Sequence, residues 1–335
     1  MTMNALSRRR LVQLAATTAF AASFAMPGLA QDSALPSGPI TIVVPFAAGG
    51  ATDTVARLVA ADLSKRLGNN VLVENVAGAG GTLGAARVSR AAPDGATLLM
   101  ATVATHAIQP SIMANPPYDP KADFTAVSLL ATVPNVLVVN NDFPAKTTAE
   151  LVGMLKEKPD EYNYGSTGIG APTHLSGELF KQMAGVSMEN VPYTGGGPAQ
   201  IDLIGGQIPI LFDVLTGEAG AIRAGTVRAL AVTTKERSPA FPDLPTVAES
   251  GVPGLETYET YTWNAIFGPA GLSPELVAEL NKALVETVND PNIHARLIEL
   301  SASPTGSTPE ELDALVDSEL ARWSEVIKTS GIELQ

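Results

Sequence analysis

The sequence VPFAAGGATDTVAR runs from Val44 to Arg57 and joins a strand pattern to a helix pattern. The β-branched run just before it, 40–44, predicts a strand buried on both faces, because such a strand needs no alternation of polar and apolar residues. After the paired glycines, apolar residues recur at helical spacing up to Leu67. A small-residue turn in this position is typical of open α/β sheets, which bind ligands at the carboxyl ends of their strands.

The same strand–turn–helix unit recurs along most of the chain. Residues 127–139 contain Pro134 and are predicted to form one or two strands, and the other strands are expected at 71–76, 96–102, 162–165, 191–193, 208–212 and 227–232. Repeated alternation predicts a parallel, doubly wound α/β architecture. Because no low-complexity linker separates two halves, we expect two domains between which the chain crosses more than once. The predicted boundaries are 31–134 plus 247–335 for domain I and 135–246 for domain II.

Three helix starts are marked by capping residues. Thr147 and Glu150 have the spacing of a capping box, and so do Thr308 and Glu311. Ser273 precedes a proline, which is the order of an N-cap followed by the first helical residue. These signals place one helix in the middle of the chain and two in its C-terminal part.

The N-terminus resembles an export signal. Arg8–Arg10 precede an apolar, alanine-rich run, and Gly28-Leu29-Ala30 supplies the small residues that a signal peptidase requires. We expect cleavage after Ala30 and a periplasmic mature chain. A general secretory signal and a twin-arginine signal both fit these residues, so the export route stays open.

Composition limits the classes of function. Of 21 Lys and Arg residues three lie in the expected signal, so 18 remain against 34 acidic residues, a net charge of −16. Nucleic acid and anionic membrane surfaces would be repelled, and a site for a small anion would have to be built locally. The chain has no cysteine, which excludes disulfides, thiol catalysis and thiolate metal sites.

Enzyme sites fit the sequence poorly. The turn after Val44 has no P-loop lysine, and Leu83 stands where a dinucleotide fingerprint needs glycine or alanine. Ser166 and His174 share a loop without the spacing of a nucleophile elbow, but a triad depends on geometry, so a serine hydrolase stays as an alternative. With three histidines and no clustered spacing, no metal site is predicted.

Two loops match an anion-binding role. Residues 45–53 and 164–174 each follow a predicted strand and precede a helix, whose free N–H groups and partial positive charge attract an anion. The alternative is a pair of ordinary turns, with Thr52 or Asp53 as an N-cap. Asp213 also follows a strand, and it would either bind an amino or hydroxyl group of a ligand or cap the next helix. Tyr193 and the glycines 195–197 would line the same site or form a structural turn.

Several longer motifs together resemble one family. VPFAAGGATDTVAR is followed in order by VENVAGAGGTLGA, APDGATLL, YGSTGIGAPTHLSGELF, VPYTGGGPAQIDLIGGQI, GTVRALAVTTKERSPAFPDLPTVAESGVPG and GPAGLSPELVAELNKAL. This order is similar to that of the Bug family, the extracytoplasmic solute receptors of tripartite tricarboxylate transporters. The likeness runs from about Ile40 to the C-terminus.

The resemblance implies a fold, a site and a function. The fold would be periplasmic-binding-protein-like (type II), with two doubly wound α/β domains and a ligand cleft between them. The receptor would close on a small carboxylate (a di- or tricarboxylate, an aromatic acid or an acidic amino acid) and deliver it to membrane transporter subunits, as a monomer that is not an enzyme and needs no cofactor. A sensing receptor for a signalling partner is the alternative. The implied ligand-binding residues are Phe46, Ala48, Gly49, Gly50, Thr52, Asp53, Thr105, Ser166, Thr167, Gly168, Gly170, Ala171, Thr173 and Asp213.

Overall fold

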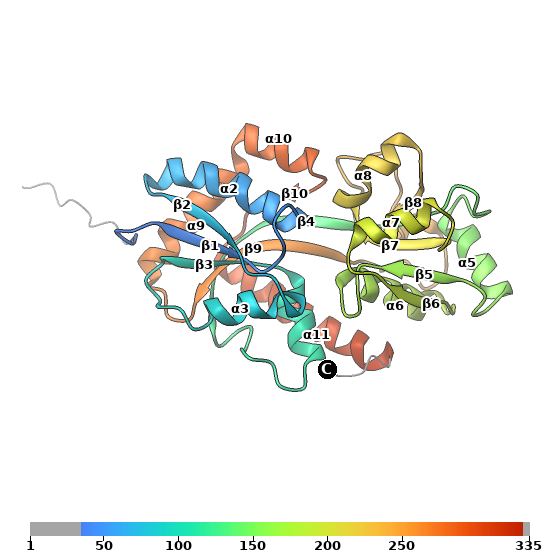
Figure 1. Cartoon of the computed structure of the whole chain (residues 1–335), viewed down its shortest axis with the longest axis horizontal. Helices are drawn as coiled ribbons and strands as arrows, with labels where there is room; N and C mark the ends of the chain where they lie inside the picture. Colours follow the sequence, from blue (N-terminus) through green and yellow to red (C-terminus); the bar gives the residue numbers. More distant parts are fainter. Residues whose placement is uncertain (1–34, 331–335) are drawn as a thin grey trace, which may run out of the picture. The chain divides into compact units, whose positions relative to one another are not determined.

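The computed structural model describes residues 35–330, so the expected export signal and its cleavage site lie outside the described residues. Over these residues, strands and helices alternate along the chain from β1 to α11 (Figure 1). The strands form one mixed sheet, and the path of the chain divides it into two sets of strands, here called the first half and the second half.

The first half contains three parallel strands. They are β1 (Ile40–Val44), β2 (Val71–Asn75) and β3 (Thr97–Ala101), in the order β2-β1-β3. All residues of β1 except Thr41 are buried, which explains the missing polar alternation. The connecting elements are α2 (Ala51–Leu67), η1 (Ala79–Gly81), α3 (Thr82–Val88), the π-helical turn η2 (Ala104–Ile108) and α4 (Gln109–Ile112).

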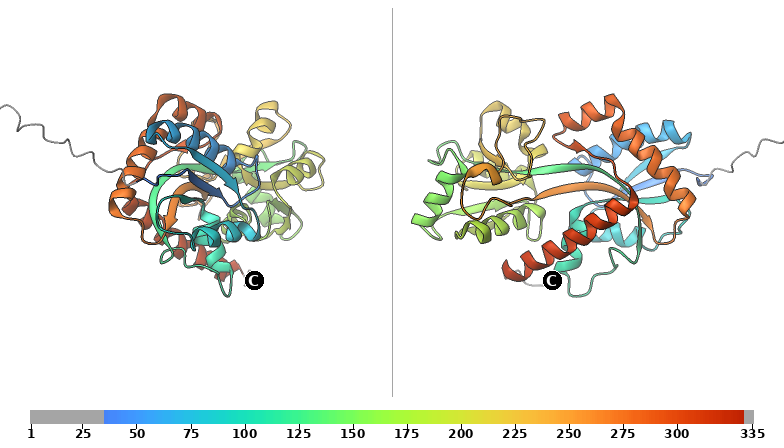
Figure 2. Two further views of the ribbon diagram at one scale, coloured as in Figure 1. Left: turned by 60° about the vertical axis from the view of Figure 1, so that its left-hand side comes forward. Right: turned by 180° about the vertical axis from the view of Figure 1, so that it is seen from behind.

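Two antiparallel strands connect the halves. β4 (Phe124–Val139) pairs with β9 (Tyr261–Pro269) from Phe124 to Pro134, and β9 also pairs with β3. From Asn135 onward β4 pairs with strands of the second half instead. The right-hand view in Figure 2 shows β4 and β9 side by side. Pro134 stands where β4 changes partners, a position where a missing backbone N–H is tolerated.

The second half repeats the parallel pattern. β5 (Asn163–Ser166), β6 (Glu189–Pro192) and β7 (Ile210–Val214) lie in the order β7-β5-β6, with β7 next to β4. β8 (Arg228–Val232) pairs with β4 as well. The connecting elements are α5 (Thr148–Glu157), α6 (Pro172–Ala184), α7 (Gly196–Ile204), α8 (Leu215–Ala224) and η3 (Ala248–Ser250).

The C-terminal part returns to the first half. It contains α9 (Pro274–Asn289), α10 (Pro291–Glu299), the short strand β10 (Ser303–Pro304) and α11 (Pro309–Ser330). β10 pairs with β4, and α11 buries Leu312, Val316 and Trp323 in the same cluster as Val43 and Leu99.

Alternating side chains of β4 separate two cores in the second half. Leu137 and Val139 pack with Tyr164, Phe180 and Phe212 on one face of the sheet. Val136 and Val138 pack with Leu203 and Leu215 on the other face. This period of two is the usual consequence of strand geometry, and it leaves the middle of the sheet buried on both sides.

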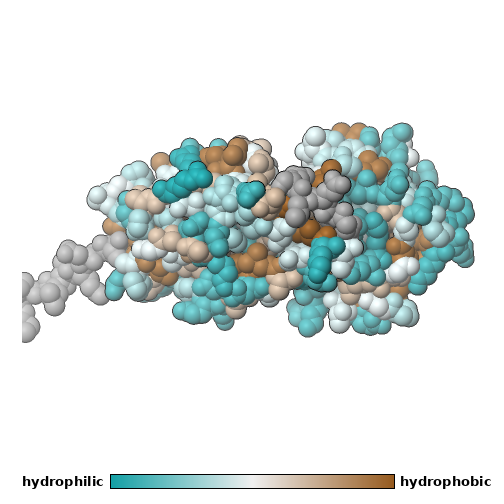
Figure 3. Space-filling view, turned by 90° about the horizontal axis from the view of Figure 1, so that it is seen from below, coloured by the Kyte–Doolittle hydropathy of each residue, from teal (hydrophilic) through white to brown (hydrophobic). Residues whose placement is uncertain are grey.

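The face drawn in Figure 3 is mainly hydrophilic. On the face drawn in Figure 3, teal residues predominate and brown residues form separate patches. The large hydrophobic side chains that are exposed in the described part of the chain are Leu72, Leu83, Ile169, Ile201 and Ile204. Between residues 35 and 330, no helix has the length and apolar character that a membrane span requires.

The structure confirms several predictions and corrects others. The parallel strands are confirmed for β2-β1-β3 and β7-β5-β6, whereas the crossing strands are antiparallel. Thr147, Ser273 and Thr308 each accept a bond from a backbone N–H three residues on, which confirms these caps. The cap predicted at Thr52 or Asp53 is wrong, because α2 already begins at Ala51 with Gly50 as its N-cap.

Two helical glycines give opposite predictions for stability. Gly153 on α5 has open space around a Cβ, so Gly153→Ala should raise the free energy of unfolding by about 0.5–1 kcal/mol. At Gly177 on α6 a Cβ would overlap the buried ring of Tyr164, so Gly177→Ala should lower it by roughly 1–3 kcal/mol despite the gain in helix propensity. Urea denaturation of the two variants measures both effects; equal shifts would contradict the packing around Tyr164.

Candidate functional site

The β1–α2 loop, residues 45–50, is an exposed turn ahead of an uncapped helix. Ala48, Gly49 and Gly50 are exposed, and Phe46 is half-buried. The N-cap Gly50 has no side chain to satisfy the first N–H groups of α2. Those groups, on residues 51–53 and thus including Thr52, have no acceptor within the helix. The loop therefore offers backbone donors and a positive helix end to an anion.

The Asp53 side chain, in the first turn of α2, holds this loop in place. Its carboxylate is buried and accepts from Gly49 N at 2.8 Å, Arg57 Nε at 3.0 Å and Asn75 Nδ2 at 2.9 Å. Burial raises the Asp53 pKa, but the bonds from Arg57, Gly49 and Asn75 outweigh it and leave the pKa below its ordinary value. With both oxygens occupied inside the chain, Asp53 is arranged to position the loop rather than to contact a ligand.

Phe46 and Thr105 both lie beside Gly81, in the glycine-rich loop 78–81 that follows β2. A Cβ at Gly81 would lie 2.8 Å from Thr105 Cγ2 and 3.2 Å from Phe46 Cζ. Thr105 is fully buried in η2, and its hydroxyl accepts from Thr102 N at 3.1 Å and lies 3.1 Å from His106 Nδ1. Burial lowers the His106 pKa to about 3, so this ring is neutral. The hydroxyl of Thr105 thus makes its hydrogen bonds within the π-helical turn and its neighbouring residues.

The β5–α6 loop is the counterpart in the second half. Thr167 N donates to Thr173 Oγ1 at 2.9 Å, and the two hydroxyls lie 2.7 Å apart. Ala171 N donates to the Gly168 carbonyl at 3.1 Å. Ala171 is the N-cap of α6 and, like Gly50, supplies no side-chain cap. Pro172, the first residue of α6, has no N–H, so the donors without an acceptor in this helix are the N–H groups of Thr173 and His174.

The Gln109 side chain of α4 lies between Gly80, in the glycine-rich loop 78–81 of the first half, and Gly170, in the β5–α6 loop of the second half. A Cβ at Gly80 would overlap the Gln109 side chain, and one at Gly170 would lie 3.9 Å from Gln109 Nε2 and 2.7 Å from Ile112 Cδ1. Both glycines have a positive φ, 62° and 71°. The sequence interpretation missed Gln109 and Ile112, because they lie beyond the strand end in a short turn that carries no motif.

The carboxyl ends of β5, β6 and β7 meet at one edge of the second half. Gly165 pairs with Leu211 in the parallel register, so Ser166 and Asp213 both lie near the carboxyl ends of neighbouring strands. Tyr193 N donates to the Ser166 carbonyl at 2.9 Å, and a Cβ at Gly196 would overlap Asp213 Oδ2. Three predicted loops of the second half, around Ser166, Tyr193 and Asp213, are thus brought together.

Asp213 does not cap a helix, which corrects one alternative. The N-cap of α8 is Val214, and Asp213 Oδ1 accepts from Val214 N at 2.6 Å. Asp213 instead faces the fully buried Glu218, and a hydrogen bond joins the two carboxyl groups when one of them carries a proton. Burial, followed by the charge of Glu218, raises the pKa of Asp213 to about 8, and burial also raises that of Glu218. The two carboxyl groups therefore share protons at neutral pH.

No hydrogen bond between residues 35 and 330 joins the β1–α2 loop directly to the β5–α6 loop. The structure thus brings Phe46 together with Thr105, and the Ser166–Thr173 loop together with Asp213. Gln109 is the contact between the first-half glycine loop and Gly170.

The geometry does not support a serine hydrolase. Ser166 Oγ is 3.5 Å from the Gly168 carbonyl, and His174 Nδ1 accepts from Gly170 N at 3.1 Å. The two side chains make no nucleophile–base hydrogen bond with each other. In the part of the chain that the structure describes, no three His, Asp or Glu residues are grouped as metal ligands.

Known proteins resemble this chain over most of its length. A family model described as "Tripartite tricarboxylate transporter family receptor" matches residues 55–332. The structure of R. palustris Rpa4515 with adipate is 38% identical, with a TM-score of 0.80 over 89% of this chain and 99% of that one. The periplasmic binding protein BugD is 38% identical, with a TM-score of 0.77 over 90% of this chain and 100% of that one.

A third solved structure, MatC from Rhodopseudomonas palustris with bound malate, is 36% identical, with a TM-score of 0.76 over 88% of this chain and 100% of that one. Together these likenesses confirm the predicted α/β periplasmic-binding-protein-like fold and the resemblance to the Bug receptors.

The Asp213–Glu218 pair should make the stability depend on pH. Because the folded pKa of Asp213 lies above its ordinary value of 3.8, the folded chain keeps a proton that the unfolded chain loses, and stability falls as pH rises from about 4 to about 8. Asp213→Asn should reduce that fall by up to about 1.4 kcal/mol per pH unit. Urea denaturation from pH 5 to about pH 8 measures it, with exposed Asp142→Asn as control. An unchanged pH slope in Asp213→Asn would contradict proton sharing.

Proposed function

The chain belongs to the tripartite tricarboxylate transporter receptor family, and from that premise we propose that it captures a small carboxylate in the periplasm and delivers it to membrane transporter subunits. The family consists of solute-binding receptors rather than enzymes. The proposed ligand is a di- or tricarboxylate, an aromatic acid or an acidic amino acid, and the proposed state is a monomer without a cofactor.

The main support is the contrast between capped and uncapped helices. α5, α9, α10 and α11 begin with side-chain caps. By contrast, α2, α6, α7 and α8, which follow β1, β5, β6 and β7, have N-caps without a side-chain bond. Free N–H groups are thus kept at the carboxyl ends of the parallel strands, where open α/β sheets bind ligands.

The proposed grip is neutral. None of the proposed contacts is Lys or Arg, so the carboxylate would be held by backbone N–H groups, by the hydroxyls of Ser166, Thr167 and Thr173 and by apolar contact with Phe46. Micromolar affinity requires about 8 kcal/mol, which several such bonds with apolar burial can supply. A receptor that must release its ligand gains from the absence of a buried ion pair.

Two relatives support a dicarboxylate in particular. Rpa4515 was solved with adipate and MatC with malate. In this chain Asp213 is the proposed contact for a hydroxyl or amino group, since it lies near the carboxyl end of β7 and against Gly196 at the start of α7, at the edge where the loops meet. A sensing receptor that binds the same ligand for a signalling partner is the alternative role.

The proposed movement is closure of two domains about the crossing strands. We predicted domain II as 135–246, and β4 does change partners at Asn135. However, Val247, Val252 and Tyr258 pack in the second half, in the core that contains Tyr164 and Phe180. We therefore propose that the second domain extends to about Thr260, just before β9 begins.

A ligand screen tests the proposed function. Di- and tricarboxylates, aromatic acids and amino acids should include a compound that raises the melting temperature and is recovered unchanged by mass spectrometry. Thr173→Val keeps the shape of the side chain but removes the hydroxyl that accepts from Thr167 N. It should lower the affinity for that compound roughly three- to tenfold. Thr305→Val is the matched control on an exposed loop. Turnover of an ester that Ser166→Ala abolishes would favour the hydrolase instead.

Closure is measured separately by small-angle X-ray scattering. Saturation with the ligand from the screen should reduce the radius of gyration, because the two halves would rotate about β4 and β9. A scattering curve that the ligand leaves unchanged would be evidence against hinge closure while leaving binding intact.

A further inference from the structure

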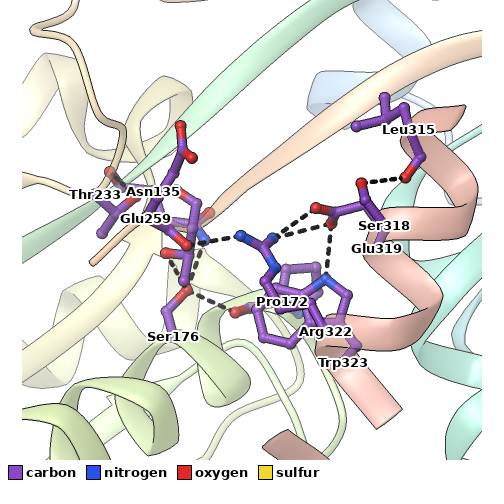
Figure 4. A network of polar contacts seen from close by, with 11 residues as sticks. Asn135, Pro172, Ser176, Thr233, Glu259, Leu315, Ser318, Glu319, Arg322 and Trp323 are labelled. Atoms are coloured by element: carbon purple, nitrogen blue, oxygen red, sulfur yellow. Dashed lines mark hydrogen bonds and ion pairs between the residues drawn. The ribbon is translucent and has the colours of Figure 1, made fainter. Parts of the chain in front are cut away.

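A buried polar network lies where the chain crosses between the halves. Asn135 of β4, Ser176 of α6, Thr233 after β8 and Thr260 before β9 are all fully buried. They come from four separate segments and form one hydrogen-bonded group (Figure 4). Buried polar groups that bond only to one another fix the relative positions of the segments that carry them.

Ser176 is the centre of this network. Its Oγ lies 2.8 Å from Asn135 Nδ2, 2.9 Å from Thr260 Oγ1 and 2.8 Å from the Pro172 carbonyl. An amide NH₂ only donates and a carbonyl only accepts, and a hydroxyl carries one hydrogen. Ser176 therefore accepts from Asn135, and it donates its one hydrogen either to the Thr260 hydroxyl or to the Pro172 carbonyl.

The bond to the Pro172 carbonyl reaches the proposed ligand loop. Pro172 is the first residue of α6 and stands between Ala171 and Thr173, both proposed ligand contacts. The Ser176 backbone is held as well, because its carbonyl accepts from Tyr258 Oη at 2.8 Å. One side chain thus joins the first turn of α6 to both segments that cross between the halves.

The crossing segments are also tied to each other and to the C-terminal helix. Thr233 Oγ1 lies 2.9 Å from the Asn135 carbonyl and 2.6 Å from the Thr260 carbonyl. Arg322 of α11, which pairs with Glu319, donates through Nη1 to the Glu259 carbonyl at 2.9 Å. Because α11 packs in the first-half core, Thr260 lies between an anchor in the first half and the Ser176 hydroxyl of the second.

The network has unused bonding capacity. Asn135 Oδ1 is buried and has no donor among residues 35–330. α6 itself belongs to both halves, since Leu175 packs in the first-half core and Phe180 in the second-half core. A rotation of the halves must therefore disturb α6 and this group of bonds together, and the spare acceptor gives a displaced hydroxyl an alternative partner.

We propose that Ser176 is a positioning residue whose hydroxyl couples the β5–α6 loop to the two crossing segments, so that ligand capture and hinge angle form a single equilibrium. This inference rests on the proposed function for its biological meaning. The coupling itself is a property of the ligand-free chain, and it is tested there.

The test compares Thr260→Val with Thr260→Ser. Valine has the shape of threonine without the hydroxyl, and serine keeps the hydroxyl, so only the first removes the bond to Ser176. Ser176→Ala removes all three hydrogen bonds of the central hydroxyl. Ser273→Ala, which deletes the cap of α9, is the control for a loss of stability outside the network.

Two measurements are made without ligand. Hydrogen–deuterium exchange of residues 166–175 should become roughly two- to tenfold faster in Thr260→Val and Ser176→Ala, and stay unchanged in Thr260→Ser and Ser273→Ala. The chain has no cysteine, so Ala61→Cys on α2 and Lys156→Cys on α5, both exposed, accept spin labels selectively. The label distance distribution should broaden or shift in Thr260→Val and Ser176→Ala only.

Adipate and malate are then titrated as probes. Where either binds, Thr260→Val should weaken it and reduce the change in label distance, although Thr260 is not among the proposed ligand contacts. If Thr260→Val matched Thr260→Ser in exchange and in distance, the coupling would be refuted. If neither probe nor any screened carboxylate bound while the ligand-free differences persisted, the proposed function would fail and the coupling would stand.

Discussion

The antiparallel pairing of β4 with β9 is the constraint on which the rest of the structure depends. These two strands are the shared centre of the sheet, since β3 pairs with β9 on one side and β7 pairs with β4 on the other. Every loop proposed to contact the ligand is attached to one of the two strand sets that this pair joins. Any movement between the sets must therefore bend or twist β4 and β9, or break the bonds around them.

Much of the first half and of the second-half parallel strands was predictable from local pattern. Buried runs such as Ile40–Val44 and capping pairs such as Thr308 with Glu311 act over a few residues, so the sequence carries them directly. β9 was not among the predicted strands, and its antiparallel pairing with β4 was not predictable, because pairing of segments more than a hundred residues apart leaves no local signal. The cap predicted at Thr52 or Asp53 was wrong because α2 already begins at Ala51, and the cap at Asp213 was wrong because α8 begins one residue later and the Asp213 side chain faces Glu218.

The site was predictable as loops but not as contacts. Glycines and hydroxyls after strand ends pointed to the β1–α2 and β5–α6 loops. The arrangement around Gln109, Glu218 and Ser176 depends on which helices face one another, and none of these residues stands in a recognisable motif. Ser176 lies three residues beyond Thr173 within α6, where a sequence pattern indicates only one more buried helical position.

The bonds of Asp53 have a consequence for the kinetics of capture. Because Gly49 N, Arg57 and Asn75 already fix that carboxylate, the β1–α2 loop has its shape before any ligand arrives. A preformed loop loses little conformational entropy on binding, so encounter with it should not wait for a local folding step. In such a receptor, differences in affinity between ligands reside in how long the complex lasts, and the first-half loop acts as a fixed template against which the second half adjusts.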